Sequence, residues 1–217
     1  MRKNLLFDLD GTLTDPQVGI IRCIQHALAK DARPVPAHEA LLWCIGPPLN
    51  ESFARLCPDL DHEGVWRLIG YYRERFATVG LFENRVFPDI PALLARLAKD
   101  HSLYVATSKP QVYARQIMDH YDLSQYFRVV YGSELDYSRA DKGELINYIL
   151  KRESIAPGEA LIVGDRLHDV RGAKIAGILS VGVTWGYGSR TELEGAGADF
   201  VVDSVGELGR LLLGGKA

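Results

Sequence analysis

The chain has 217 residues, of which 47% are hydrophobic and 24% charged, and its formal net charge is −3. A chain of this length and composition builds a full globular core without disulfides or structural metals, and its three cysteines show no CxxC spacing. Because Lys and Arg do not cluster and no apolar run approaches the roughly 20 residues of a membrane helix, we expect a cytoplasmic protein that binds neither nucleic-acid polymers nor membranes.

The first part of the chain predicts one strand followed by a helical insertion. Asn4–Phe7 is a short apolar run typical of a buried strand. No strand is predicted between Pro16 and Glu83. Apolar residues at three- and four-residue spacing instead predict helices at Gly19–Lys30, His38–Cys44, Asn50–Cys57 and His62–Thr78. Residues 16–83 are therefore expected to form a separate helical domain.

From Val86 onward, predicted strands and helices alternate. The apolar runs typical of buried parallel strands are Leu103–Ala106, Val129–Tyr131, Leu161–Val163, Ser180–Val183 and Phe200–Val202. The helices predicted between them are Ile90–Lys99, Val112–Tyr121, Lys142–Arg152 and Val170–Ala176. This alternation predicts an α/β fold with a Rossmann-like parallel-sheet core, made of residues 1–15 and 84–217.

Polar side chains gather where the predicted strands end. The residues that follow strands directly are Asp8, Asp10, Gly11, Thr107, Ser108, Lys109 and Asp165, with Asp169 shortly after and Lys142 at the start of a predicted helix. Because the carboxyl ends of parallel strands form one edge of the sheet, these groups are expected to converge there. Three carboxylates held close together repel one another unless a cation lies among them, and an all-oxygen site suits Mg²⁺.

The same residues carry a resemblance to a known family. Residues 8–15, DLDGTLTD, look like the opening motif of the haloacid dehalogenase (HAD) superfamily, and Thr107, Lys142 and Asp165 with Asp169 stand in order where its other three motifs occur. The resemblance covers nearly the whole chain and implies that the helical domain is a cap. Because pump-like relatives carry Thr where Asp10 stands, the resemblance implies a phosphatase or a phosphomutase.

Shorter runs point to branches within the superfamily. Residues 182–188, GVTWGYG, resemble the phosphoglycolate-phosphatase-like branch, whereas residues 132–142 and the GPPL run at 46–49 resemble a 5′-nucleotidase-like branch. The chain departs from many relatives because Gly143, not proline, follows Lys142. The expected function is a magnesium-dependent phosphomonoesterase acting on small phosphorylated metabolites, with 5′-nucleotides preferred. The alternatives are a phosphoglycolate phosphatase and a sugar phosphomutase.

The resemblance also implies roles for the site residues. Asp8 is expected to be the nucleophile that forms an aspartyl-phosphate, and Asp10 the general acid and base. The metal would be held by Asp8, Asp165 and the backbone carbonyl of Asp10. Asp169 would not bind the metal directly but would orient its water ligands or Lys142. The residues expected to bind the phosphoryl group are Thr107, Ser108, Lys142 and Gly11.

Several alternatives remain open from the sequence. Lys109 competes with Lys142 as the main phosphate-binding lysine, and Asp169 could simply cap the helix predicted from Val170. Asp15 is interpreted as a helix cap. In the helical domain, Arg73 and Pro47 are candidates for reading the leaving group, although packing between helices explains the aromatic cluster around Arg73 more simply.

Overall fold

The computed structural model describes residues 2–214, and the chain divides into two compact units. One unit comprises Met1–Asp15 and Val86–Ala217, and the other comprises Pro16–Arg85. The structure places the second boundary between the units at Arg85 and Val86, two residues after the boundary expected from the sequence, between residues 83 and 84. Within residues 2–214, no helix combines the length and apolar character that a bilayer-spanning segment requires.

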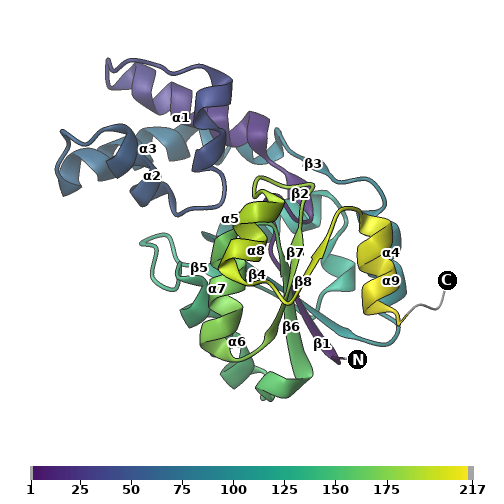
Figure 1. Ribbon diagram of the computed structural model, residues 1–217. Helices are drawn as coiled ribbons and strands as arrows, with labels where there is room; N and C mark the ends of the chain where they lie inside the picture. The colour runs from purple at the N-terminus through teal and green to yellow at the C-terminus, as the bar shows by residue number, and fades with distance from the viewer. Residues whose placement is uncertain (1, 215–217) are drawn as a thin grey trace. The chain divides into compact units, whose positions relative to one another are not determined.

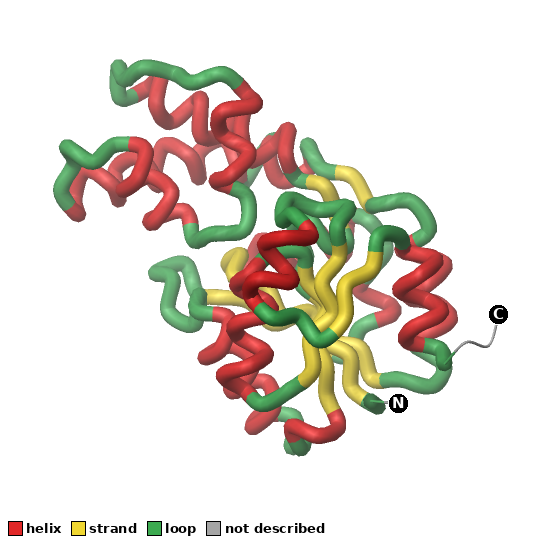
Figure 2. The backbone as a smooth tube through the Cα atoms, viewed as in Figure 1, coloured by secondary structure: helices red, strands yellow, loops and turns green. Residues whose placement is uncertain are grey.

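The larger unit is built on a six-stranded parallel sheet (Figures 1 and 2). In spatial order its strands are β5 (Val129–Ser133), β4 (Ser102–Pro110), β1 (Asn4–Phe7), β6 (Ala160–Gly164), β7 (Leu179–Val183) and β8 (Phe200–Val202). Every neighbouring pair is parallel, which confirms the predicted sheet and all six predicted strands. Short β2 (Thr14–Asp15) and β3 (Arg85–Val86) pair with each other in a second sheet.

The strand order places a switch point beside β1. From β1 the chain builds outward through β4 to β5 on one side, and through β6 and β7 to β8 on the other. In open α/β sheets, ligands bind beyond the carboxyl ends of the strands at such a point. Phe7 pairs with Val163, so the residues that follow β1 and β6 emerge side by side.

Helices cover both faces of the sheet. The helices of this unit are α4 (Ile90–Leu97), α5 (Gln111–His120), α6 (Lys142–Arg152), α7 (Leu167–Ala176), α8 (Arg190–Ala196) and α9 (Val205–Leu212), with 3₁₀ turns η3 (Ser124–Tyr126) and η4 (Pro157–Glu159). Figure 1 shows α4 beside α9 on one face, and α6, α7 and α8 on the other. Leu6, Ile146, Ile162 and Ala173 belong to the buried cluster that joins β1 and β6 to α6 and α7.

The smaller unit is helical, as the sequence predicts. Its elements are α1 (Gln17–Lys30), the 3₁₀ helix η1 (His38–Cys44), α2 (Leu49–Leu56), α3 (His62–Phe76) and η2 (Gly80–Phe82). Tyr72 is buried on α3, where its ring packs edge-on against Phe53 and stacks on Phe76. The aromatic cluster near Arg73 therefore forms part of this unit's core.

Two helices were not predicted, although the sequence holds a signal for each. Ser189 and Ser204 precede α8 and α9, and each side chain accepts a hydrogen bond from the backbone of the glutamate three residues later. Ser-x-x-Glu is a helix-start pattern, but glycines inside both short helices weaken their periodicity. A third difference is that α7 begins at Leu167, three residues before the predicted start.

Candidate active site

Asp8 and Asp10 are placed by the end of β1 and by the tight turn that follows it. The backbone N–H of Asp8 donates to the Val163 carbonyl at 2.9 Å, which holds the end of β1 against β6. The turn closes through the N–H of Gly11, which donates to the Thr14 carbonyl at 2.7 Å. Gly11 has a φ of +87°, and a Cβ there would lie 2.2 Å from the Asp165 carboxylate, so only glycine fits.

Neighbouring strands bring in the other predicted groups. Thr107 is buried near the end of β4, and its hydroxyl accepts a hydrogen bond from the Lys109 N–H at 3.2 Å. Asp165 follows β6 directly and is fully buried. The sheet thus brings the predicted groups of β1, β4 and β6 to one edge.

Asp169 does not cap a helix starting at Val170, because α7 has already begun at Leu167. It occupies the third helical position, where its carboxylate accepts from the Arg166 N–H at 3.2 Å. From there its other oxygen, Oδ1, lies 2.8 Å from the ammonium of Lys142. The interpretation of Asp169 as a plain N-cap is therefore wrong.

The two candidate lysines contact different aspartates. Lys142 opens α6, and its buried ammonium lies 2.9 Å from Asp8 Oδ1 and donates to the Ala106 carbonyl at 2.9 Å. Burial alone would lower the pKa of Lys142, but the carboxylates of Asp169 and Asp8 outweigh it and raise that pKa. Lys109 Nζ lies 2.5 Å from Asp10 Oδ2 instead. Lys142 is thus the lysine beside the predicted nucleophile.

Asp8, Asp165 and Asp169 form a group that could hold a cation. Each offers a carboxylate oxygen within 4.8 Å of the others, and all three are buried. Burial, with the neighbouring charges of Asp8 and Asp169, raises the pKa of Asp165 well above its usual range. Among the residues that the structure describes, Asp165 Oδ1 has no hydrogen-bond partner. A buried oxygen of this kind, amid repelling carboxylates, fits a hard divalent cation such as Mg²⁺.

Asp10 lies outside that carboxylate group and has a different environment. Burial raises the pKa of Asp10, and the nearby Lys109 ammonium opposes the rise. Asp10 Oδ2 faces Lys109, while Oδ1 is buried without a hydrogen-bond partner in the described part of the chain. A carboxyl group with a raised pKa is suited to giving and taking a proton near neutral pH.

Ser108 is engaged with the protein's own backbone. Its hydroxyl donates to the Ala140 carbonyl at 2.8 Å, and the Ser133 hydroxyl donates to the Ser108 carbonyl at 2.8 Å. These two bonds tie the last part of β4, where its pairing with β5 shifts register, to β5 and to the loop before α6. In this geometry the Ser108 hydroxyl positions the end of β4 that carries Thr107 and Lys109.

Arg73 and Pro47, the candidates for reading the leaving group, belong to the helical unit. The Arg73 guanidinium lies 5.7 Å from the centre of the Trp66 ring, and Pro47 lies in the loop between η1 and α2. The structure therefore gives Arg73 a partner within its own unit.

Sequence reasoning missed the direct contacts of the loop after β7. The Tyr187 N–H donates to Asp165 Oδ2 at 2.7 Å, and the Trp185 indole donates to the Thr12 carbonyl at 3.2 Å. The GYG run at 186–188 could have indicated these contacts, since glycines that follow a strand at this edge let the backbone approach the site residues closely.

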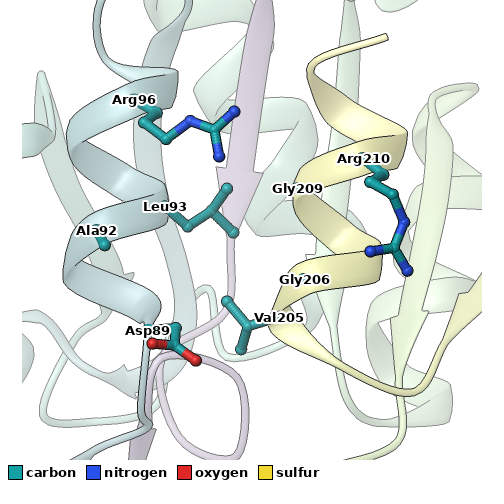
Figure 3. A pocket seen from close by; sticks show the side chains of 8 residues that line it. All are labelled: Asp89, Ala92, Leu93, Arg96, Val205, Gly206, Gly209 and Arg210. Atoms are coloured by element: carbon teal, nitrogen blue, oxygen red, sulfur yellow. The ribbon is translucent and has the colours of Figure 1, made fainter. Parts of the chain in front are cut away.

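A separate cavity of about 410 Å³ lies between α4 and α9. Figure 3 shows Leu93 and Val205 pointing into the space between these helices, with Arg96 and Arg210 further along them. None of the carboxylates or lysines described above lines this cavity. The polar cluster at the sheet edge is thus the candidate active site.

Comparison with known proteins identifies the family. The family described as haloacid dehalogenase-like hydrolase matches residues 5–183. The chain belongs to this family of hydrolases. The predicted superfamily, its α/β fold and the hydrolase class are confirmed.

This hydrolase is similar to several named proteins. It is 48% identical to a 5′-nucleotidase of Pseudomonas aeruginosa, over 88% of this chain and 86% of that protein. It is 38% identical to the tyrosine-protein kinase PtkA of Mycobacterium tuberculosis, over 85% of this chain but 62% of PtkA. A phosphoglycolate phosphatase of Shigella boydii is 27% identical, over 95% of this chain and 90% of that protein. The crystal structure of a predicted phosphatase from Clostridium acetobutylicum superposes with a TM-score of 0.95 at 40% identity, covering 99% of both chains.

Proposed function

We propose that this hydrolase is a magnesium-dependent phosphomonoesterase that acts through an aspartyl-phosphate on Asp8. Its expected substrates are small phosphorylated metabolites, with 5′-nucleotides preferred. The observation that carries the proposal is the position of Asp8, whose carboxylate contacts the Lys142 ammonium and also belongs to the buried group with Asp165 and Asp169. One carboxylate is thereby held beside both a fixed cation and a candidate metal site.

The two N-terminal aspartates have the environments that a two-step hydrolysis needs. A carboxylate oxygen of Asp8 attacks phosphorus, and the bond from phosphorus to the leaving oxygen breaks as Asp10 gives that oxygen its proton. Asp10 then takes a proton from a water molecule that attacks the aspartyl-phosphate. This second step releases inorganic phosphate and restores the Asp8 carboxylate. The raised pKa of Asp10 supports its role as the acid in the first step.

The phosphoryl group needs positive charge and hydrogen-bond donors around it. Lys142 and Thr107 are proposed to bind its oxygens. Gly11, whose N–H is bonded within the turn, is proposed to let the backbone approach the phosphoryl group closely. Asp8, Asp165 and the Asp10 backbone carbonyl would hold Mg²⁺, and Asp169 would orient Lys142. When bound there, Mg²⁺ supplies further neutralisation of the phosphate charge.

The preference for 5′-nucleotides is supported by the 48% identical relative, which is named a 5′-nucleotidase. The more distant relative named a phosphoglycolate phosphatase makes phosphoglycolate the second candidate substrate. Arg73 and Pro47 remain candidates for reading the leaving group, because they lie on the helical unit, the part of the chain proposed to act as the cap.

The test is a panel of phosphomonoesters with the purified protein. Purine and pyrimidine 5′-monophosphates, phosphoglycolate and hexose 1-phosphates are incubated with MgCl₂ or with EDTA, and both released phosphate and organic products are measured. We expect Mg²⁺-dependent phosphate release that is fastest with a 5′-nucleotide. Preference for phosphoglycolate would replace the proposed substrate with the second candidate. An isomerised hexose phosphate without phosphate release would make the protein a mutase, and no Mg²⁺-dependent turnover on any ester would contradict the proposal.

A further inference from the structure

The loop at 184–188 joins two parts of the site that are far apart in sequence. Tyr187 contacts both of them, because its N–H donates to Asp165 Oδ2 at 2.7 Å while its phenol donates to the carboxylate of Asp15. Asp15 ends β2, the strand that follows the turn carrying Asp10. One residue thus links a candidate metal ligand after β6 to the segment that leads away from β1.

The hydrogen bond to Asp165 determines which oxygen remains available. Oδ2 is occupied by the Tyr187 N–H, whereas Oδ1 has no hydrogen-bond partner among residues 2–214. A carboxylate held through one oxygen presents the other in a fixed direction. Metal sites commonly orient their ligands in this way, through partners behind the ligands themselves.

The two residues that flank Tyr187 contribute no side-chain anchor to this loop. Gly186 and Gly188 flank it, and neither carries a side chain that could anchor the loop. Both must be glycine, since a Cβ at Gly186 would lie 2.3 Å from Asp165 Oδ2 and one at Gly188 would lie 2.0 Å from the Asp165 carbonyl. The close approach to Asp165 therefore excludes anchoring side chains on either side of Tyr187.

The phenol of Tyr187 is in a position to supply that anchor. Asp15 is itself buried, so the hydrogen bond from the Tyr187 phenol to its carboxylate is shielded from water. A second bond, from the Trp185 indole to the Thr12 carbonyl at 3.2 Å, attaches the same loop to the turn after β1.

We propose that Tyr187 is a positioning residue for the metal site: its phenol, anchored on Asp15, fixes the backbone N–H that orients the Asp165 carboxylate toward a divalent cation. The inference rests on the proposed function, because it assumes that Asp165 binds Mg²⁺. It adds a residue pair, Tyr187 and Asp15, that acts on the metal site through Asp165.

The test measures Mg²⁺ affinity directly, by isothermal titration calorimetry of EDTA-treated protein with MgCl₂. Tyr187→Phe keeps the ring and removes the phenol, and we expect it to weaken Mg²⁺ binding about tenfold, as is typical for loss of a group behind a metal ligand. The matched control is Tyr131→Phe, because the Tyr131 phenol also donates to a carboxylate, that of Glu153, which is not one of the candidate metal ligands. The control should leave the affinity unchanged.

Variants of Asp15 separate positioning from a general loss of packing. Asp15→Asn keeps an oxygen that can accept from the phenol and should bind Mg²⁺ within about threefold of wild type. Asp15→Ala should weaken binding as much as Tyr187→Phe, and the double variant should lose little more, since both changes break one interaction. If Asp15→Ala fails to fold, Tyr187→Phe and Asp15→Asn still decide the question.

The outcomes distinguish this inference from the proposed function. Unchanged Mg²⁺ affinity in Tyr187→Phe, with Mg²⁺-dependent turnover in the wild type, would overturn the positioning role alone. Equal losses in Tyr187→Phe and Tyr131→Phe would overturn it as well, because the effect would then be general destabilisation. Absence of Mg²⁺ binding by the wild-type protein would overturn both the inference and the metal-dependent function.

Discussion

At the scale of single residues, the site is organised around two buried lysine–aspartate contacts. Lys142 contacts Asp8, and Lys109 contacts Asp10. The two ammonium groups come from different elements, Lys142 from the start of α6 and Lys109 from β4. The proposed nucleophile and the proposed acid are therefore held in different electrostatic environments only two residues apart.

Asp8→Asn tests the proposed nucleophile. An amide cannot form the aspartyl-phosphate, so turnover should fall by more than about a thousandfold. The fold should persist, since the amide is nearly the same size, and the thermal unfolding midpoint should stay within a few degrees of wild type. Asp59→Asn, at a surface ion pair with Arg33, is the control and should keep full turnover. Near-native phosphate release by purified Asp8→Asn would contradict the covalent scheme.

Replacing each lysine by methionine tests which of them serves the phosphoryl group. Lys142→Met should lower kcat/KM by about a hundredfold or more, because it removes a fixed charge beside Asp8. Lys109→Met should lower it by less than about tenfold, because loss of the Lys109 ammonium raises the Asp10 pKa further and leaves Asp10 able to act as an acid. Steady-state kinetics on the preferred substrate measures both. The opposite order would assign the main phosphate-binding role to Lys109.

At the scale of elements, the position of Lys142 depends on how closely α6 and α7 pack. A Cβ at Gly172 on α7 would lie 2.8 Å from Lys142 Cγ and 3.0 Å from the Lys142 backbone carbon. Gly172 therefore lets the start of α6 approach α7, and this approach brings Lys142 to both Asp8 and Asp169.

Gly172→Ala tests this packing. The added methyl group should displace the start of α6, destabilise the protein by about 1–3 kcal/mol and reduce turnover with it. Gly195→Ala is the control, because Gly195 lies on exposed α8 with no heavy atom near an added Cβ. Alanine there should stabilise by about 0.5–1 kcal/mol and leave turnover unchanged. Chemical denaturation and phosphate release measure the two effects, and equal stability of both variants would contradict the packing role.

Within the helical unit, Glu83 joins the segment after η2 to α3 and α1. It accepts hydrogen bonds from Arg75 at 2.6 and 3.0 Å and from Arg22 at 2.7 Å. The Arg75 hydrogen bond holds the pKa of Glu83 below its ordinary value of 4.5. A lowered carboxyl pKa contributes stability above the unfolded-state pKa, and this contribution is lost as the pH falls through the folded-state value.

Glu83→Gln should therefore lower the free energy of unfolding by about 1–2 kcal/mol at pH 7. The difference from wild type should shrink as the pH falls below 4.5, where the wild-type carboxylate also becomes protonated. Urea unfolding across this pH range measures it. Glu74→Gln, at a half-exposed pair with Lys30, should change the free energy of unfolding much less than Glu83→Gln does. A Glu83→Gln difference that does not depend on pH would contradict the role of the charge.

At the scale of the whole molecule, the carboxylate group, as the proposed metal site, should make stability depend on Mg²⁺. Mg²⁺ at about 100 times its dissociation constant stabilises the folded state by about 2.7 kcal/mol. In a chain of this size, that gain should raise the unfolding midpoint by about 5–10 °C. Asp165→Asn should remove most of the shift. No shift in the wild type, or the same shift in Asp165→Asn, would contradict the proposed metal site.

The sequence by itself determined the larger features of this protein. Continuous apolar runs predicted all six strands of the main sheet, because a strand buried on both faces needs apolar residues throughout. The loss of strand patterns between residues 16 and 83 predicted the helical unit. Aspartates directly after strands predicted where the site lies, since parallel strands end at one edge. These features depend on local patterns, which the chain carries without reference to its distant parts.

Only the tertiary structure decided which distant groups meet. Which lysine lies beside Asp8 depends on the packing of α6 against α7 and on the register shift in β4, and neither is visible in the local sequence. Asp169 contacts Lys142 from the first turn of α7, because that helix begins at Leu167 and not at the predicted Val170. Asp15, interpreted as a helix cap, instead accepts a hydrogen bond from Tyr187, 172 residues away. Contacts between residues so far apart are set by how the elements pack, and that packing is a property of the whole chain.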